Sequence, residues 1–347
     1  MGGVQMAGRS SQWHRWLTRG GLLFLVPVLV VVAFTGYIFS VGAQQRHAVT
    51  LPPPGLPDMA GDQGARLARF QVDGRLDAAR VETRFDEIRG RFEGMRVIFV
   101  PSYLSDAVIP TVRLGEDLGY MAGIYNWLAA EGIDAEIADI ETEDTVAANA
   151  DRLARIIGSG TSPICFVTHS KGGLDVMEYL RRATPDQRER VACWIAMQAP
   201  FSGSPVADLA RDVSGLSELM DAVLSVLGGR GESLTDLTTG AREAYLAGHR
   251  NEIASVLDTV PMLCVATYVA DPGNFARPTS WSYPTLVWMH EHGVPSDGLV
   301  PVRSAIDICP QSITLEGLGH TGIVSPGLIA PIDQTALMRL LFHLVLG

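Results

Sequence analysis

A single serine stands between an apolar run and a pair of glycines in "FVTHSKGGLD", residues 166–175. The residues before it, "SPICFVTH", predict a short buried strand, and those after it have apolar residues at helical spacing. A sharp strand-to-helix turn crowds the backbone, so small residues are needed two positions before and two after the turn residue. Gly172 meets this need well, and the β-branched Thr168 meets it less well. This context predicts that the Ser170 hydroxyl stands clear of a sheet edge, where a nucleophile can act.

A serine hydroxyl becomes a good nucleophile only when a base removes its proton, and the chain has eight histidines that could serve. His320 is the preferred base because it follows "SITLEGLG", the last predicted strand, and so emerges at the same sheet edge as Ser170. The other histidines fall in the amino-terminal segment, a stalk, an insertion, a loop or the final helix. His169 is adjacent to the serine, on a turn that is expected to point its side chain elsewhere.

The imidazole needs a carboxylate that fixes its tautomer and stabilises the imidazolium. Asp297 is the preferred acid, in the turn-rich stretch "VPSDGLVPVRSA" between the last two predicted strands. Asp271 is the alternative, because it directly follows the predicted strand "PMLCVATYVA". Asp307 is disfavoured, because it precedes a strand instead of following one.

The elements that must position these residues alternate along the chain from about residue 95 onward. The predicted strands are 96–103, 133–140, 162–169, 191–200, 261–270 and 311–318. The predicted helices between and after them are 115–132, 145–160, the stretch after Ser170, and about 331–346. This alternation predicts a parallel sheet with helices on both faces, whose functional groups gather at the carboxyl ends of the strands.

The interval between residues 201 and 260 is too long for an ordinary connection. It contains an apolar stripe at helical spacing over residues 216–227 and a second predicted helix over about 239–257. We therefore expect a helical cap inserted over about 202–258. The stripe either faces the sheet or lines an apolar substrate cleft, and periodicity does not distinguish the two.

The amino-terminal region predicts a membrane anchor. Residues 21–43 carry no charge and have about the length that crosses a bilayer. Residues 1–20 contain Arg9, Arg15 and Arg19 and no acidic residue, which predicts a cytoplasmic amino terminus. A cleaved signal peptide is the alternative, but the apolar cores of such peptides run about 7–15 residues. We therefore expect an exported, periplasmic or extracellular domain that is membrane-bound, or secreted if the segment is cleaved.

Residues 44–93 are predicted to connect this anchor to the main domain, residues 94–347. They begin with a proline- and glycine-rich stalk, "LPPPGLPDMAGDQG", which suits a semi-rigid spacer. A helix follows, and its apolar face is expected to pack on the main domain; that face is formed by Val81, Phe85, Ile88 and Phe92.

Charge and cysteine content exclude some functions. A formal net charge of -11 argues against nucleic acid as a partner. The four cysteines lie in or beside apolar runs, and their spacing fits no zinc site. Neighbouring parallel strands seldom present cysteines in bridging geometry, so we expect buried free thiols in place of two disulfides. Nothing in the sequence calls for a cofactor.

The order Ser170, Asp297, His320 on an alternating α/β pattern resembles the α/β-hydrolase fold, and specifically the bacterial lipases and esterases. The resemblance covers roughly residues 96–347 and rests on the stretches "THSKGGLD", "APFSGSPVAD", "SDGLVP" and "LGHTG". It implies a serine hydrolase that cleaves carboxylic esters, of a lipid-like kind, through an acyl-enzyme. The alternatives are an acyltransferase or amidase with the same residues, or a non-catalytic membrane-tethered binding protein of the same fold.

The resemblance also implies an oxyanion hole. Lipases usually have a His-Gly pair after the first core strand, where this chain has Pro101 and Ser102. By analogy, the backbone amides of Tyr103 and Lys171 would hold the oxyanion. Because no glycine marks the turn, the first donor could instead be Ser102 or Leu104.

Overall fold

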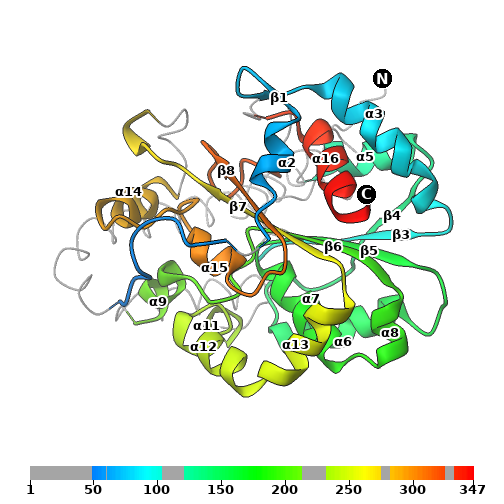
Figure 1. The fold of residues 1–347 in the computed structure, drawn as a ribbon. Helices are drawn as coiled ribbons and strands as arrows, with labels where there is room; N and C mark the ends of the chain where they lie inside the picture. Colours follow the sequence, from blue (N-terminus) through cyan, green and yellow to red (C-terminus); the bar gives the residue numbers. More distant parts are fainter. Residues whose placement is uncertain (1–48, 60, 104–120, 213–231, 275–281, 325–331) are drawn as a thin grey trace, which may run out of the picture. The chain divides into compact units, whose positions relative to one another are not determined.

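A computed structural model describes residues 49–59, 61–103, 121–212, 232–274, 282–324 and 332–347 (Figure 1). All of them belong to one compact unit, residues 47–347. The predicted cytoplasmic segment and membrane anchor, residues 1–43, lie outside the described residues. Among the described helices, none has the length and apolar character of a membrane span.

Six parallel strands form the central sheet in the order β4-β3-β5-β6-β7-β8 (Figure 1). Their bounds are Arg96–Val100 (β3), Asp134–Ile137 (β4), Ile164–His169 (β5), Val191–Met197 (β6), Met262–Tyr268 (β7) and Ser312–Glu316 (β8). Each coincides with a predicted strand. Every residue of β5 is buried, because helices cover both faces of the parallel sheet. A small antiparallel pair, Gln71–Val72 (β1) and Arg75–Leu76 (β2), precedes the sheet.

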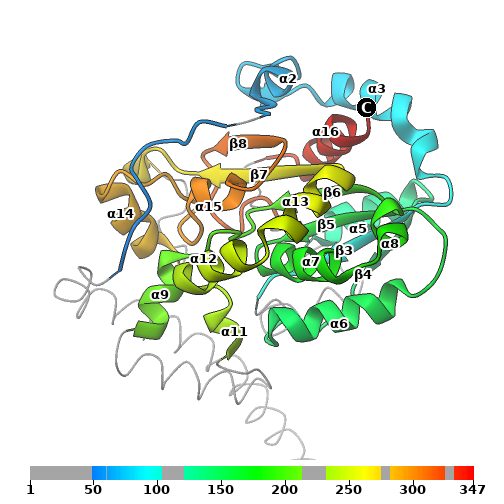
Figure 2. The ribbon, with the colours of Figure 1, turned by 60° about the horizontal axis from the view of Figure 1, so that its bottom comes forward.

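Helices cover both faces of the sheet, as Figures 1 and 2 show. One face carries Ala78–Ile88 (α3), Ala122–Ala130 (α5) and Gln334–Leu346 (α16). The other carries Val146–Ile157 (α6), Lys171–Arg182 (α7), Pro185–Glu189 (α8) and Arg250–Thr259 (α13). The predicted α/β class with a parallel sheet between two helix layers is therefore confirmed. Gly64–Ala68 (α2) lies before β1, and the 3-10 turn Arg89–Phe92 (η2) continues α3.

Helix α3 packs on the domain through the face that its spacing predicts. Asp77 caps the helix by accepting a hydrogen bond from the Arg80 amide at 3.1 Å. Phe85, in the helix, and Phe92, in η2, are buried, with ring centroids 6.5 and 5.1 Å from that of Phe342 in α16. This apolar contact holds α3 against the same helix layer as α16.

The interval between β6 and β7 contains Pro205–Asp212 (α9), Glu232–Thr235 (α11), Thr239–Gly248 (α12) and α13. Residues 213–231, with the predicted apolar stripe, lie outside the described residues. The predicted single helix over 239–257 is two helices that meet at His249, whose φ of -121° and ψ of 25° leave the helical region. Helix α13 packs against α7 and α8 and so belongs to the regular helix layer. The cap stays a prediction for the rest of the interval.

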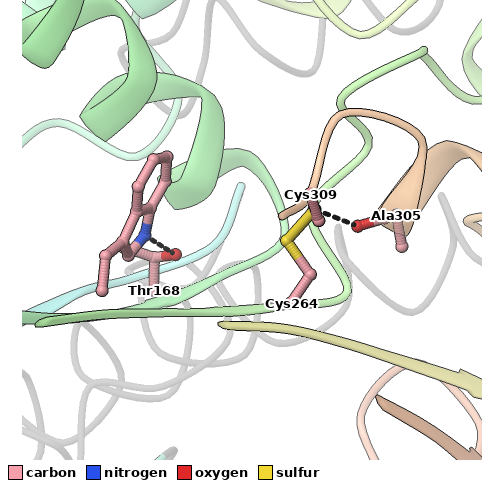
Figure 3. The surroundings of a disulfide bond; sticks show 5 residues. Thr168, Cys264, Ala305 and Cys309 are labelled. Carbon is pink, nitrogen blue, oxygen red and sulfur yellow. Dashed lines mark hydrogen bonds between the residues drawn. A yellow bond between two sulfur atoms is a disulfide. The ribbon is translucent and has the colours of Figure 1, made fainter. Parts of the chain in front are cut away.

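The expectation of free thiols is wrong. Cys165 on β5 pairs with Cys193 on β6, and the second disulfide joins Cys264 to Cys309 (Figure 3). The register between β5 and β6 shifts at Cys165, and the two Cα atoms lie 4.6 Å apart, within bridging range. Cys309 is not on a strand at all, because the run before it forms the helix Val302–Ile306 (α15). The geometric objection to a bridge between two neighbouring strands therefore does not apply to the Cys264–Cys309 disulfide.

The connection between β7 and β8 carries the remaining described elements. These are the 3-10 turn Pro272–Asn274 (η4), the helix Tyr283–Glu291 (α14) and α15. His290, which the sequence placed in a loop, lies within α14. The same connection contains Asp271 and Asp297, the two candidate acids.

Candidate active site

Ser170 occupies a strained turn between β5 and α7. Its φ of 53° and ψ of -127° put a non-glycine residue in the left-handed half of the map, at a cost of about 1–3 kcal/mol. The Ser170 amide donates to the carbonyl of Met197 on β6 at 2.9 Å, and the Gly173 amide donates to the Ser170 carbonyl at 3.0 Å. These bonds hold the serine at the carboxyl end of β5, as predicted, with 9% of its surface exposed.

The two glycines after Ser170 allow α7 to pack very closely. A Cβ on Gly172 would lie 2.4 Å from the carbonyl oxygen of Val100 and 2.6 Å from that of Pro101. A Cβ on Gly173 would lie 2.5 Å from the Cβ of Ala199. The first turn of α7 therefore contacts the end of β3 directly, which brings the Lys171 backbone close to the segment that follows β3.

The surroundings of Thr168 explain why the turn tolerates this β-branched residue where a smaller one is expected. Its hydroxyl accepts a hydrogen bond from the Trp194 indole at 3.1 Å (Figure 3). Both side chains are fully buried. The polar side chain is therefore satisfied inside the sheet, and it packs below the turn without displacing it.

His320 and Asp297 are in direct contact. His320 Nδ1 lies 2.8 Å from Asp297 Oδ2, and the His320 amide donates to the Asp297 carbonyl at 2.9 Å. Asp297 Oδ1 accepts from the amides of Leu299 and Val300 at 2.9 and 2.7 Å. Because a carboxylate only accepts hydrogen bonds, Nδ1 is the donor of the neutral imidazole. The lone pair is then on Nε2, as a general base requires.

The segment "APFSGSPVAD" supports the turn that carries Asp297. Ser204 Oγ donates to the carbonyl of Leu299 at 2.7 Å. The carbonyl of Gly203 accepts from Ser304 Oγ at 2.6 Å. Hydrogen bonds thus tie the segment after β6 to the Asp297 turn and to the helix α15 that follows it, although about a hundred residues separate them in sequence.

Asp271, the alternative acid, lies in a different environment. It is exposed, and its Oδ1 accepts from the Gly273 amide at 2.9 Å within its own loop. Asp297 is the carboxylate at the Nδ1 atom of His320, so the geometry favours Asp297.

His169 belongs to this site, contrary to the expectation that its side chain points elsewhere. Its ring centroid lies 4.8 Å from that of His320, and its Nε2 atom is 3.0 Å from the His320 carbonyl oxygen. Since His169 and Ser170 are neighbours in the chain, this contact shows that the His320 loop lies at the sheet edge that carries Ser170. One sequence signal could have found it: the strand is apolar up to Val167 and then ends in two polar residues, Thr168 and His169.

Lys171 contributes its backbone and side chain to different regions. The Nζ atom lies 3.0 and 3.1 Å from the two carboxylate oxygens of Asp175, and both side chains are 1% exposed. Asn149 on α6 donates to the same carboxylate at 3.1 Å. Burial raises the pKa of Asp175 to about 6, opposed by the charge and hydrogen bond of Lys171. The Lys171 side chain thus pairs with Asp175 within α7, and Asp175 in turn binds Asn149 on α6, so only the Lys171 amide remains for an oxyanion.

The other predicted oxyanion donor, Tyr103, lies in the turn directly after β3. Its phenol oxygen accepts a hydrogen bond from Ser233 Oγ of α11 at 3.2 Å. Leu104, the alternative donor, lies outside the described residues, and the choice among Tyr103, Ser102 and Leu104 stays a prediction. Within the part of the chain that the structure describes, no group of three or more His, Cys, Asp or Glu residues could hold a metal ion.

The strand order and the turn at Ser170 indicate the class of fold, and solved structures that are similar to this chain have the same fold. The chain is similar to a metagenomic carboxyl esterase, with a TM-score of 0.61, 19% identity, and coverage of 87% of this chain and 98% of that one. It is similar to a Bacillus licheniformis lipase in its mature form, with a TM-score of 0.52, 19% identity and coverage of 73% and 91%. It is also similar to a Staphylococcus hyicus lipase, with a TM-score of 0.50, 13% identity, and coverage of 73% of this chain and 94% of that one.

The protein therefore has the α/β-hydrolase fold that this esterase and these lipases share. No family model matches the sequence, and no curated protein matches it significantly.

Proposed function

We propose that the protein is a serine hydrolase that cleaves carboxylic esters, with Ser170 as nucleophile, His320 as general base and Asp297 as the supporting acid. The observation that carries this proposal is the 2.8 Å contact between His320 and Asp297 at the sheet edge where Ser170 is presented. Its fold is shared with carboxylesterases and lipases, which supports ester hydrolysis over other acyl chemistry. A lipid-like ester is the proposed substrate class.

The reaction would proceed through an acyl-enzyme. His320 Nε2 takes the Ser170 proton while Oγ forms a bond to the ester carbonyl carbon. The resulting oxyanion is held by the Lys171 amide, at the amino terminus of α7, and by the Tyr103 amide, after β3. Losing one such donor typically costs about 2.7–4 kcal/mol. When the C–O bond breaks, the imidazolium returns its proton to the leaving alcohol. A water molecule then attacks the acyl-enzyme by the same route, which releases the acid and restores Ser170.

A fluorophosphonate probe tests this function directly. We expect wild-type protein to be labelled stoichiometrically and Ser170→Ala not at all, because the probe phosphonylates only an activated serine. A series of p-nitrophenyl esters then tests the substrate class, and we expect activity to peak at long acyl chains. A maximum at acetate or butyrate would contradict a lipid substrate. Absence of labelling would favour a binding protein, and ester formation with an added alcohol would indicate an acyltransferase.

We also propose that the catalytic domain is exported and anchored by residues 21–43. The uncharged segment and the arginines before it support this topology. The two disulfides of the catalytic domain support it independently, because structural disulfides persist mainly in oxidising compartments.

Fractionation of bacteria that express the full chain tests this topology. We expect the full-length protein to stay with the membranes after a high-salt wash, and a variant without residues 1–43 to be released. A soluble product that begins near Gln44 would show that the segment is a cleaved signal peptide. Labelling of all four cysteines by a thiol reagent without prior reduction would remove the support from the disulfides.

A further inference from the structure

The loop that carries His320 is rich in glycine and needs external support. It follows β8 with the residues "GLGHTG", and Gly317 adopts a φ of 83° that disfavours other residue types. Glycines give a loop much backbone freedom, whereas proton transfer requires the imidazole to stay within about an ångström of its working position. The Asp297 side chain orients the ring, and the Asp297 carbonyl binds the His320 amide, but the carbonyl groups of Gly319 and His320 need other partners.

Two buried side chains from neighbouring strands bind the backbone carbonyls of this loop. His169, the last residue of β5, has its Nε2 atom 3.0 Å from the His320 carbonyl oxygen. Gln198, the residue after β6, donates from its Nε2 atom to the Gly319 carbonyl at 3.3 Å. The two side chains also contact each other, with His169 Nε2 at 2.8 Å from Gln198 Oε1. Both are almost completely buried.

The donor and acceptor roles in this network are mutually consistent. Gln198 Nε2 faces a carbonyl oxygen and the hydroxyl of Thr267 on β7, so that atom is the amide donor and Oε1 faces His169. His169 Nε2 then faces two acceptors, and it must carry the ring proton. Hydrogen bonds thus run from β5 through the ends of β6 and β7 to the loop after β8, across four adjacent strands (Figure 1).

The backbone at Gln198, like that at Ser170, has a positive φ. Its φ of 52° makes it one of four non-glycine residues with positive φ among the described residues, together with Ser170, Asp73 and Met121. Such a conformation persists only where surrounding interactions enforce it. Here the Gln198 amide donates to the Val265 carbonyl at 2.7 Å, which holds the side chain at the sheet edge.

We propose that His169 is a positioning residue for the reaction: with Gln198, it fixes the backbone of His320 at the height that proton transfer from Ser170 requires. This inference rests on the proposed hydrolase function. It assigns a role to a histidine that does not exchange protons with the substrate. In agreement, burial and then the neighbouring His320 ring lower the pKa of His169 to about 3, so the ring stays neutral beside a partner that must become an imidazolium.

The test compares His169→Leu, which removes the donor, with His169→Gln, whose amide can reach the same carbonyl. We expect His169→Leu to lower kcat roughly 10- to 100-fold with KM within about threefold of wild type. His169→Gln should recover most of that loss. Active sites are counted from the final extent of fluorophosphonate labelling. For His169→Leu we expect full labelling that is reached more slowly, because the site is intact but misaligned.

Tyr245→Phe is the matched control, since it removes one hydrogen bond, from α12 to Glu178 on α7 at 2.7 Å, without touching the Ser170 turn or the His320 loop. We expect its rate per labelled site to equal that of wild type. If His169→Leu fails to fold, Gln198→Met provides the second variant and should show the same slow, complete labelling.

Three outcomes would overturn the proposal. The first is a wild-type rate per labelled site in His169→Leu or Gln198→Met. The second is a lower labelled fraction with an unchanged rate per site, which would indicate only a structural role. The third is wild-type protein that is neither labelled nor active, which would remove the hydrolase function and this inference with it. Only in the first two does the hydrolase function survive.

Discussion

Replacing Ser170 by alanine is expected to lower kcat for p-nitrophenyl esters by a factor on the order of 10⁵–10⁶, as loss of the nucleophile does in serine hydrolases. The remaining groups, His320 and the oxyanion donors, cannot form an acyl-enzyme and leave only a small residual rate. The assay requires protein prepared without contact with wild-type enzyme, because trace contamination would conceal a loss of this size. Retention of more than about a hundredth of wild-type kcat would exclude Ser170 as the nucleophile.

The thermal stability of a second variant, Ser170→Gly, shows whether activity is lost through the missing nucleophile or through loss of the fold. The left-handed φ of 53° at Ser170 costs about 1–3 kcal/mol for a residue with a side chain, and glycine does not incur this cost. Glycine adds about 0.5–1 kcal/mol of unfolding entropy. We therefore expect Ser170→Gly to be inactive, with a Tm equal to or above that of wild type. A lower Tm would mean that the serine side chain contributes to stability in a way that the backbone geometry does not indicate.

Replacing Asp297 by asparagine is expected to lower kcat roughly 10⁴-fold while KM changes little. Asparagine can still accept from the amides of Leu299 and Val300 through its oxygen. Its amide nitrogen would then face His320 Nδ1, which must accept, so the ring proton moves to Nε2. In that tautomer the imidazole cannot take the serine proton. Initial rates at saturating ester, with active sites counted, measure the effect.

Asp271→Asn is the matched control, because it makes the same chemical change on an exposed loop after β7. We expect its kcat to stay within about twofold of wild type, as for most surface substitutions. A large loss in Asp271→Asn together with a small one in Asp297→Asn would reverse the assignment of the acid. Comparable losses in both would indicate that the connection between β7 and β8 acts as one unit.

The sequence alone determined the strands of the sheet and the place of the turn at Ser170. Strands and helices follow from the period of apolar residues, which is a local property, and all six strands of the sheet were predicted from it. The turn at Ser170 follows from the glycines at 172 and 173, because only a side chain without Cβ fits against β3 and Ala199. The position of His320 at the same sheet edge follows from its place after the last strand, since the carboxyl ends of parallel strands lie at one edge of a sheet.

Only the tertiary structure decided which side chains meet across that edge. Asp297 and Asp271 both occur in the connection after β7, and the path of that connection brings Asp297 to His320. The Cys264–Cys309 pairing depends on the path of the chain after α15, which brings Cys309 to β7. His169 and Gln198 join the site through bonds to a loop more than a hundred residues away. Such contacts depend on loop paths and on strand register, and neither leaves a periodic signal in the residues themselves.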